Sequence, residues 1–191
     1  MSHIVTGTQK NSVATGHEVN RTRQFLTFLI GQDLFGVDIL EVKEILEIST
    51  ITQIPMTPNY IRGVINLRGS VVPIIDLAAR LERQPSEIGK HSCMILVSIT
   101  VKSAQTQFAE NHILGLLVDR VNEIMEFSAE NILPAPDFGS EIRTEFIHAM
   151  GRVDNSFVIL LALDRVLTLA ELSQLQKSVN SQANTLDLQA P

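Results

Sequence analysis

Side chains that commonly carry catalysis are few in this sequence and form no familiar motif. The 191 residues contain no HExxH, GxSxG, GxxxxGK or GxGxxG pattern. The single cysteine, Cys93, lies in the apolar run CMILVSI, which is typical of a buried, reduced thiol. His148 could line a groove, although an exposed or hydrogen-bonded histidine is more common than a metal ligand. We therefore expect no catalytic residue, metal or cofactor; an enzyme with an active site assembled from distant residues is the alternative.

Three glutamates form the most regular charged pattern. Glu41, Glu44 and Glu47 are spaced i, i+3, i+6, so on a helix they would form one acidic stripe beside apolar Val42 and Ile45. A solvated helix face is the ordinary explanation of such a stripe. A partner-binding ridge is the functional alternative, because an apolar contact next to a charge gives an interface both affinity and register.

An arginine interrupts the most apolar part of the first half of the chain. In YIRGVINLRGSVVPIIDL, residues 60–77, two β-branched runs are separated by Arg68, Gly69 and Ser70, which predicts a hairpin whose turn uses the positive φ of glycine. A guanidinium projected from such a rigid turn suits a carboxylate or carbonyl-rich partner. An exposed arginine that serves solubility is the equally weighted alternative.

Short β-like runs punctuated by turns must position these residues. They predict barrels or a sandwich, with short helices in the gaps. Thr57 and Pro58 would begin one brief turn, and Asp76 would cap residues 77–83. Asp164 would cap a longer C-terminal helix with four apolar residues on one side, Val166, Leu169, Leu172 and Leu175. Residues 1–23 are polar and aperiodic and are expected to be disordered, and residues 173–191 comprise the helix end and a frayed tail.

The chain also contains an internal repeat. Residues 34–55 match residues 113–134 without a gap, which pairs Gly36 with Gly115 and Glu44 with Glu123. A second match pairs Gly63 with Gly151. Duplication is a better explanation than chance similarity of β-rich stretches, so we expect two similar barrels, residues 24–90 and 91–170, around a shared apolar core.

Composition excludes several functional classes. The formal net charge is −6 and the basic residues are scattered, which argues against nucleic-acid binding. The longest apolar runs are far shorter than the roughly 18 residues that cross a bilayer, so no direct membrane insertion is expected. Together with the lone cysteine, these features indicate a cytoplasmic protein.

At this point the hairpin and the repeat resemble a known family. The hairpin pattern GxINLRGxxxPxIDL, with FGVDILEVKEI before it and GLLVDRVNEIM and ILPAPDF after it, is similar to the CheW family of chemotaxis coupling proteins over residues 24–172. The resemblance implies a mainly β, CheW-like fold of two five-stranded SH3-like β-barrels. It also implies a non-enzymatic adaptor that links the cytoplasmic tip of methyl-accepting chemoreceptors to the regulatory domain of the histidine kinase CheA, recruited to receptor arrays.

The resemblance also assigns a receptor-binding surface to this chain. Carried over by position, that surface would use Val42, Glu44, Gly63, Asn66, Arg68 and Gly69. The strip from Val121 to Ile124 would form the opposite wall of a groove. Arg68 would either contact the receptor or support the docking surface. A polar loop at residues 101–112 is longer than the family usually has. The coupling protein of another chemosensory pathway, such as pilus motility, stays open because the fold does not specify the pathway.

Overall fold

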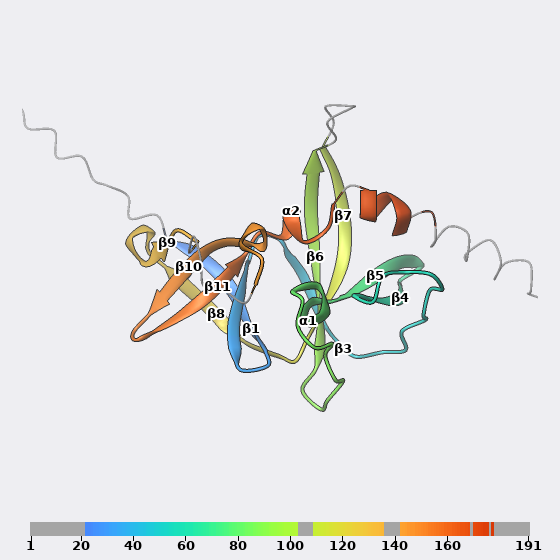
Figure 1. The fold of residues 1–191 in the computed structure, drawn as a ribbon, viewed down its shortest axis with the longest axis horizontal. Helices are drawn as coiled ribbons and strands as arrows, with labels where there is room; N and C mark the ends of the chain where they lie inside the picture. Colours follow the sequence, from blue (N-terminus) through green and yellow to red (C-terminus); the bar gives the residue numbers. More distant parts are fainter. Residues whose placement is uncertain (1–21, 103–108, 136–141, 169, 176, 178–191) are drawn as a thin grey trace, which may run out of the picture.

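The computed structural model describes residues 22–102, 109–135, 142–168, 170–175 and 177. Most of the expected disordered leader and the tail from residue 178 lie outside the described residues, but Arg23 already begins the first strand. In this described part of the chain, eleven strands form two sheets that lie next to each other (Figure 1). The expectation of a mainly β fold is confirmed.

The two sheets differ by one strand. In spatial order, the six-stranded sheet contains β8 (Arg120–Phe127), β1 (Arg23–Ile30), β2 (Asp33–Asp38), β11 (Ser156–Leu161), β10 (Ile147–Val153) and β9 (Ile132–Leu133). The five-stranded sheet contains β3 (Val42–Glu47), β6 (Cys93–Lys102), β7 (Ala109–Val118), β5 (Ser70–Asp76) and β4 (Ile61–Leu67). Among the described residues up to 166, the helical elements are α1 (Leu77–Arg80), η1 (Ala129–Asn131), η2 (Thr144–Phe146) and α2 (Leu163–Val166).

The halves of the chain exchange hairpins. The β1–β2 hairpin joins the strands β8 to β11 of the second half, and the β6–β7 hairpin joins β3 to β5 of the first half. The sheets therefore do not follow the expected division into residues 24–90 and 91–170. The exchange follows the internal repeat. Each sheet combines the first hairpin of one repeat with the later strands of the other.

Matched glycines lie at the two joints of the exchange. β2 pairs in parallel with β11, where Gly36 lies opposite Leu160, and β7 pairs in parallel with β5, where Gly115 lies opposite Ile74. A Cβ atom on Gly115 would lie 2.4 Å from Cδ1 of Ile74, and one on Gly36 would lie 3.0 Å from Cδ2 of Leu160. A side chain at these positions would displace the neighbouring core residue, so the glycines permit the close approach of the strands.

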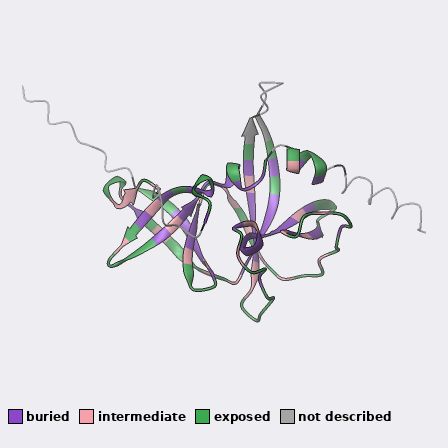
Figure 2. Cartoon of the chain, viewed as in Figure 1, coloured by how far each residue is buried: buried purple, intermediate pink, exposed green. Residues whose placement is uncertain are grey.

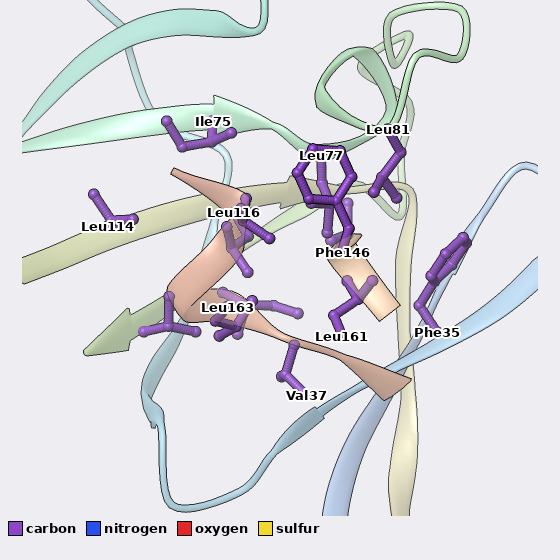
Figure 3. Close-up of a cluster of buried hydrophobic side chains, with 14 of the residues drawn as sticks. Phe35, Val37, Ile75, Leu77, Leu81, Leu114, Leu116, Phe146, Leu161 and Leu163 are labelled. Carbon is purple, nitrogen blue, oxygen red and sulfur yellow. The ribbon is translucent and has the colours of Figure 1, made fainter. Parts of the chain in front are cut away.

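Three apolar clusters hold the sheets. One small cluster belongs to each sheet, and the largest is shared between them. Figure 2 shows that both sheets contain buried positions, and Figure 3 shows part of the shared cluster. Strand β6 is buried on both faces. Met94 and Leu96 pack in the small cluster of the five-stranded sheet, whereas Ile95 and Val97 pack in the shared core. Successive side chains of a strand point to opposite faces, so a strand buried on both faces reads as one apolar run. The expected shared core is thus confirmed.

Of the helix starts predicted at Thr57 and Asp76, the structure has the one at Asp76. Asp76 caps α1 as expected, and its buried carboxylate accepts hydrogen bonds from the backbone N–H groups of Ala79 (3.1 Å) and Ser86 (3.0 Å). The Thr57 hydroxyl instead donates to the carbonyl of Ile54, and the turn after it is closed by Ile61 N–H donating to Pro58. No helix in the described part of the chain is long and apolar enough to span a membrane.

The C-terminal helix does not begin at Asp164. Ala162 is the N-cap of the short α2, the chain leaves the helix at Leu167, and a second helical segment covers residues 170–175. Thr168 and Glu171 explain the break, because they form a capping box: the Glu171 carboxylate accepts the Thr168 N–H at 2.7 Å, and the Thr168 hydroxyl accepts the Glu171 N–H at 3.2 Å. Leu169 lies outside the described residues.

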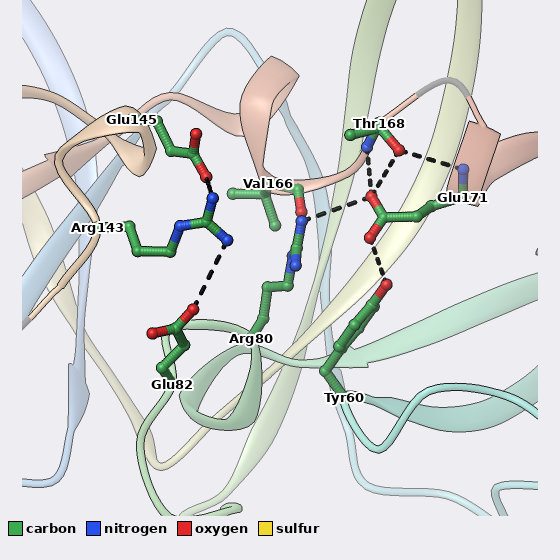
Figure 4. A network of polar contacts seen from close by, with 8 residues as sticks. All are labelled: Tyr60, Arg80, Glu82, Arg143, Glu145, Val166, Thr168 and Glu171. Carbon is green, nitrogen blue, oxygen red and sulfur yellow. Dashed lines mark hydrogen bonds and ion pairs between the residues drawn. The ribbon is translucent and has the colours of Figure 1, made fainter.

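A polar network fastens this second segment to the sheets (Figure 4). Glu171 accepts a hydrogen bond from the Tyr60 hydroxyl at 2.5 Å, and Arg80 lies between the rings of Tyr60 and Phe146 while donating to the Val166 carbonyl. Burial and then the bond to Glu171 raise the pKa of Tyr60 to about 12. Burial opposes ionisation of Glu171, but the bonds from Tyr60 and Thr168 outweigh it and lower the pKa of Glu171.

Half of the expected polar loop is strand. Residues 101–102 and 109–112 extend the β6–β7 ladder, in which Lys102 lies opposite Ala109. Residues 103–108 lie outside the described residues. The insertion therefore lengthens a hairpin that is already part of the five-stranded sheet.

Replacing Gly115 by alanine should destabilise the fold by about 1–3 kcal/mol, because the new methyl group overpacks the cluster around Ile74. Urea unfolding of the variant measures the loss. The double variant Gly115→Ala/Ile74→Val should lose less than the sum of the two single changes, because valine lacks the Cδ1 atom that collides. The control Gly89→Ala, whose added Cβ atom would meet only Ser92 Oγ at an ordinary contact distance of 3.9 Å, should stay within about 0.5 kcal/mol of wild type. Additive losses in the double variant would contradict the packing at this joint.

Replacing Asp76 by alanine should cost about 2–4 kcal/mol in urea unfolding, because two buried N–H groups lose their acceptor. Asp33→Ala provides the control, since its ion pair with Arg83 is half exposed and should contribute at most about 1 kcal/mol. Equal effects of the two substitutions would show that the buried cap is not the stabilising feature.

Candidate partner-binding site

The turn between β4 and β5 projects Arg68 from a rigid base. Leu67 pairs with Ser70, and the two turn residues Arg68 and Gly69 have φ values of 54° and 88°. Positive φ at both positions is the signature of a type I′ turn, which matches the twist of the flanking strands. The Asn66 side-chain oxygen accepts the Gly69 N–H at 2.9 Å. The sequence pattern predicted a positive φ for glycine alone, whereas Arg68 adopts one too.

Arg68 pairs with another of the predicted site residues. Its Nη2 atom lies 3.2 Å from Oε1 of Glu44, and the two side chains are 78% and 36% exposed. The pair joins the hairpin to β3, the edge strand at the other side of the five-stranded sheet. Such an exposed pair contributes at most about 1 kcal/mol to stability, so its principal effect is on geometry.

The glutamate stripe expected on a helix is wrong. Residues 42–47 form the strand β3, which pairs with β6, so Glu44 and Glu47 point to opposite faces, and Glu41 precedes the strand. A register shift between Val42 and Glu44 turns Val42 and Ile45 to the same side. From Glu44 to Glu47, beyond the shift, half-buried and exposed residues alternate with the strand period of 2.

Gly63 supports the hairpin from inside. It is buried in β4 at a register shift, with φ 137°, and a Cβ atom there would lie 2.1 Å from the Thr52 carbonyl oxygen. Thr52 and Val64 exchange two backbone hydrogen bonds beside it, of 2.9 and 2.8 Å. The structure therefore places Gly63 beneath the surface, where it allows an extra segment to pack against β4.

The second predicted strip occupies the matching position in the six-stranded sheet. Val121 and Ile124 lie on its edge strand β8 opposite Phe28 and Leu26 of the shared core. Val42 and Ile45 lie opposite Val97 and Ile95 of the same core. Directly opposed residues point to the same face, so both strips border the shared core.

The hollow that Ile124 lines is also lined by Arg152, Val153 and Asp154, at the end of β10 and in the turn that leads to β11. That the two strips form opposite walls of one groove stays a prediction.

Exposed apolar residues mark both strips. Ile45 is 45% exposed and its repeat partner Ile124 is 54% exposed. Ile45 was not among the predicted site residues, because those were carried over by position from the CheW resemblance. We use the term docking face for the surface along the edge strand β3 and the neighbouring turn that is formed by Val42, Glu44, Ile45 and Arg68, in which Glu44 and Ile45 leave β3 on opposite sides.

One hollow gathers titratable groups, and sequence analysis did not anticipate it. It lies beside Glu41, where burial, then Asp38 and Asp164, raise the pKa of Glu41 to about 7, with Arg23 opposing. His148 reaches the same hollow and lies 3.2 Å from Arg23. The described lining residues of the hollow include no serine, cysteine, threonine or lysine.

The other candidates for chemistry are also accounted for. Burial raises the pKa of the Cys93 thiol, which disfavours the nucleophilic thiolate. Among the described residues, no three His, Cys, Asp or Glu side chains are placed to hold a metal ion.

Comparison with known proteins agrees with this geometry. The family model of the CheW-like domain matches residues 24–171. Chemotaxis protein CheW of Klebsiella aerogenes is 32% identical over 151 residues, which cover 79% of this chain and 85% of that protein. Probable chemotaxis protein CheW of Rhizobium etli is 34% identical over 149 residues, covering 78% and 90%. Protein FrzA of Myxococcus xanthus is 29% identical over 134 residues, covering 70% and 76%.

A solved structure shows the same architecture. The crystal structure of the scaffolding protein TtCheW from Thermoanaerobacter tengcongensis superposes with a TM-score of 0.68 at 29% identity, covering 81% of this chain and 94% of that one. Because the family model spans both sheets, the chain belongs to the CheW family of chemotaxis adaptor proteins.

Proposed function

We propose that this chain couples chemoreceptors to a histidine kinase by binding the helical cytoplasmic tip of a receptor at the docking face. The observation that supports it is the Arg68–Glu44 pair, which brings the hairpin turn beside the apolar residues of an edge strand. A helix laid on an apolar strip with charged margins is a common recognition mode. In this proposal Val42 and Ile45 supply apolar contact, and the ion pair holds the hairpin in place.

The second partner in this proposal is the regulatory domain of a CheA-type kinase, which family resemblance suggests. The adaptor acts in the cytoplasm, is recruited to receptor arrays and catalyses no reaction itself. Modest contacts suffice there, because an array gains affinity through multivalency. The similarity to Protein FrzA favours a second candidate, in which the same docking face serves a different chemosensory pathway.

Charge reversal at Arg68 tests the docking face. In co-sedimentation with receptor-containing membranes and kinase, Arg68→Glu and Glu44→Arg should each weaken recruitment about 5- to 30-fold, equivalent to about 1–2 kcal/mol. The double variant Glu44→Arg/Arg68→Glu should recover to within about threefold of wild type if the pair acts by positioning the hairpin.

Arg143→Glu is the matched control, because Arg143 is likewise an exposed arginine paired with carboxylates, those of Glu82 and Glu145, and belongs to neither strip. It should leave receptor recruitment unchanged. A double variant as weak as either single one would show that Arg68 contacts the receptor directly. Failure of the wild-type protein to bind receptor or kinase would contradict the proposed coupling.

Truncation of the exposed isoleucine tests the apolar contact. Ile45→Ala should reduce receptor recruitment about 3- to 10-fold while lowering unfolding stability by at most about 1 kcal/mol, because the side chain is 45% exposed in the free protein. Ile88→Ala, which removes a similarly exposed isoleucine elsewhere, should change neither quantity. Equal loss of recruitment in both variants would place the contact outside the docking face.

A further inference from the structure

The link between β2 and β3 carries the chain from one sheet to the other. β2 ends at Asp38 in the six-stranded sheet, and β3 begins at Val42 in the five-stranded sheet. The backbone of Glu41 is hydrogen-bonded to a strand of each sheet. Its N–H donates to the carbonyl of Asp38 in β2 at 3.0 Å, and its carbonyl accepts the N–H of Ser98 in β6 at 2.8 Å. The position of Glu41 therefore determines how the first residues of β3 meet both sheets.

Charges crowd this link. Glu41 borders a hollow of about 520 Å³, and the charged and titratable side chains facing it come from four elements: Arg23 of β1, Asp38 of β2, His148 of β10, and Asp164 and Arg165 of α2. The Arg23 guanidinium is already engaged, with Asp38 at 2.7 Å and with His148 at 3.2 Å. An ionised Glu41 would therefore be the third carboxylate in this partly buried hollow, beside Asp38 and Asp164. The Arg23 guanidinium is already shared between Asp38 and His148.

Ionisation of Glu41 is consequently unfavourable in the folded state. Burial, then Asp38 and Asp164, raise its pKa from 4.5 to about 7, and Arg23 opposes them. Because the folded state holds this proton more tightly than the unfolded chain, the contribution of Glu41 to stability falls as pH rises from about 4.5 through 7. The charged form dominates above that range, and it is the form that strains the link.

We propose that the β2–β3 link is a pH-responsive joint, in which ionisation of Glu41 loosens the bonds that hold the start of β3 to both sheets. The internal repeat supports the assignment to this link alone. At the equivalent link between β7 and β8, the residue matching Glu41 is Arg120, and the residue matching Asp38 is Leu117. The carboxylates that crowd the first link therefore have no counterparts at these positions of the second.

Loosening of this joint would change the docking face, because Val42 is the next residue after Glu41 and Glu44 lies two residues further along β3. That consequence for coupling rests on the proposed function. The joint itself is a property of the free protein and can be measured without a receptor.

Amide hydrogen exchange tests the joint. The amide of Ser98, whose hydrogen bond ends on the Glu41 carbonyl, should lose protection about fivefold to tenfold between pH 6 and pH 8, after correction for the intrinsic exchange rate. In Glu41→Gln the protection should stay constant over this range. The Asp119 amide, which donates to the Leu29 carbonyl at the second link, should keep constant protection in both proteins.

Two controls decide which group responds. Glu47→Gln, on the exposed face of β3, and His148→Gln, in the hollow, should both keep the wild-type pH dependence at Ser98. Constant protection of Ser98 in the wild-type protein would overturn the proposal, as would an equal loss in Glu41→Gln or its disappearance in His148→Gln. Failure of receptor binding would leave these exchange results unaffected, so the joint and the proposed function are tested separately.

Discussion

Two parallel strand pairs, β2 with β11 and β5 with β7, are the constraint on which this structure depends. Each pair joins strands from different halves of the chain, and each requires a glycine where a core side chain crosses the ladder. The exchange leaves neither half with a complete sheet of its own. It also explains the arrangement of the apolar clusters, because the exchanged strands β1 and β6 each supply side chains both to a small cluster and to the shared core.

The docking face inherits its rigidity from this arrangement. β4 and β5 are held at one end of the five-stranded sheet, β3 is held by β6 at the other, and the pair between Arg68 and Glu44 connects them. An adaptor benefits from such a face, because side chains ordered before binding lose less entropy when the partner arrives. The turn contributes as well, since its backbone geometry fixes the direction in which Arg68 leaves the sheet.

Much of this could be predicted from residue patterns, and the failures have identifiable physical causes. The hairpin turn, the Asp76 cap and the repeat follow from local chemistry, which needs no knowledge of distant strands. The exchange of hairpins could not be predicted, because a repeat shows which segments are alike without showing which of them pair. Glu41, Glu44 and Glu47 fitted a helical period by chance over too short a window, and the pairing of β3 with β6 overrode it. The crowding around Glu41 arises from β1, β10 and α2, which are distant in sequence.

The central claim is that the exchanged hairpins make both sheets one cooperative unit. Methyl NMR through a urea titration tests it most directly, with Ile74 reporting on the small cluster of the five-stranded sheet and Val158 on that of the six-stranded sheet. We predict that both methyl signals give the same midpoint and the same free energy of unfolding, since neither sheet is complete without strands from both halves. Two separated transitions, with one cluster intact while the other is unfolded, would contradict the account.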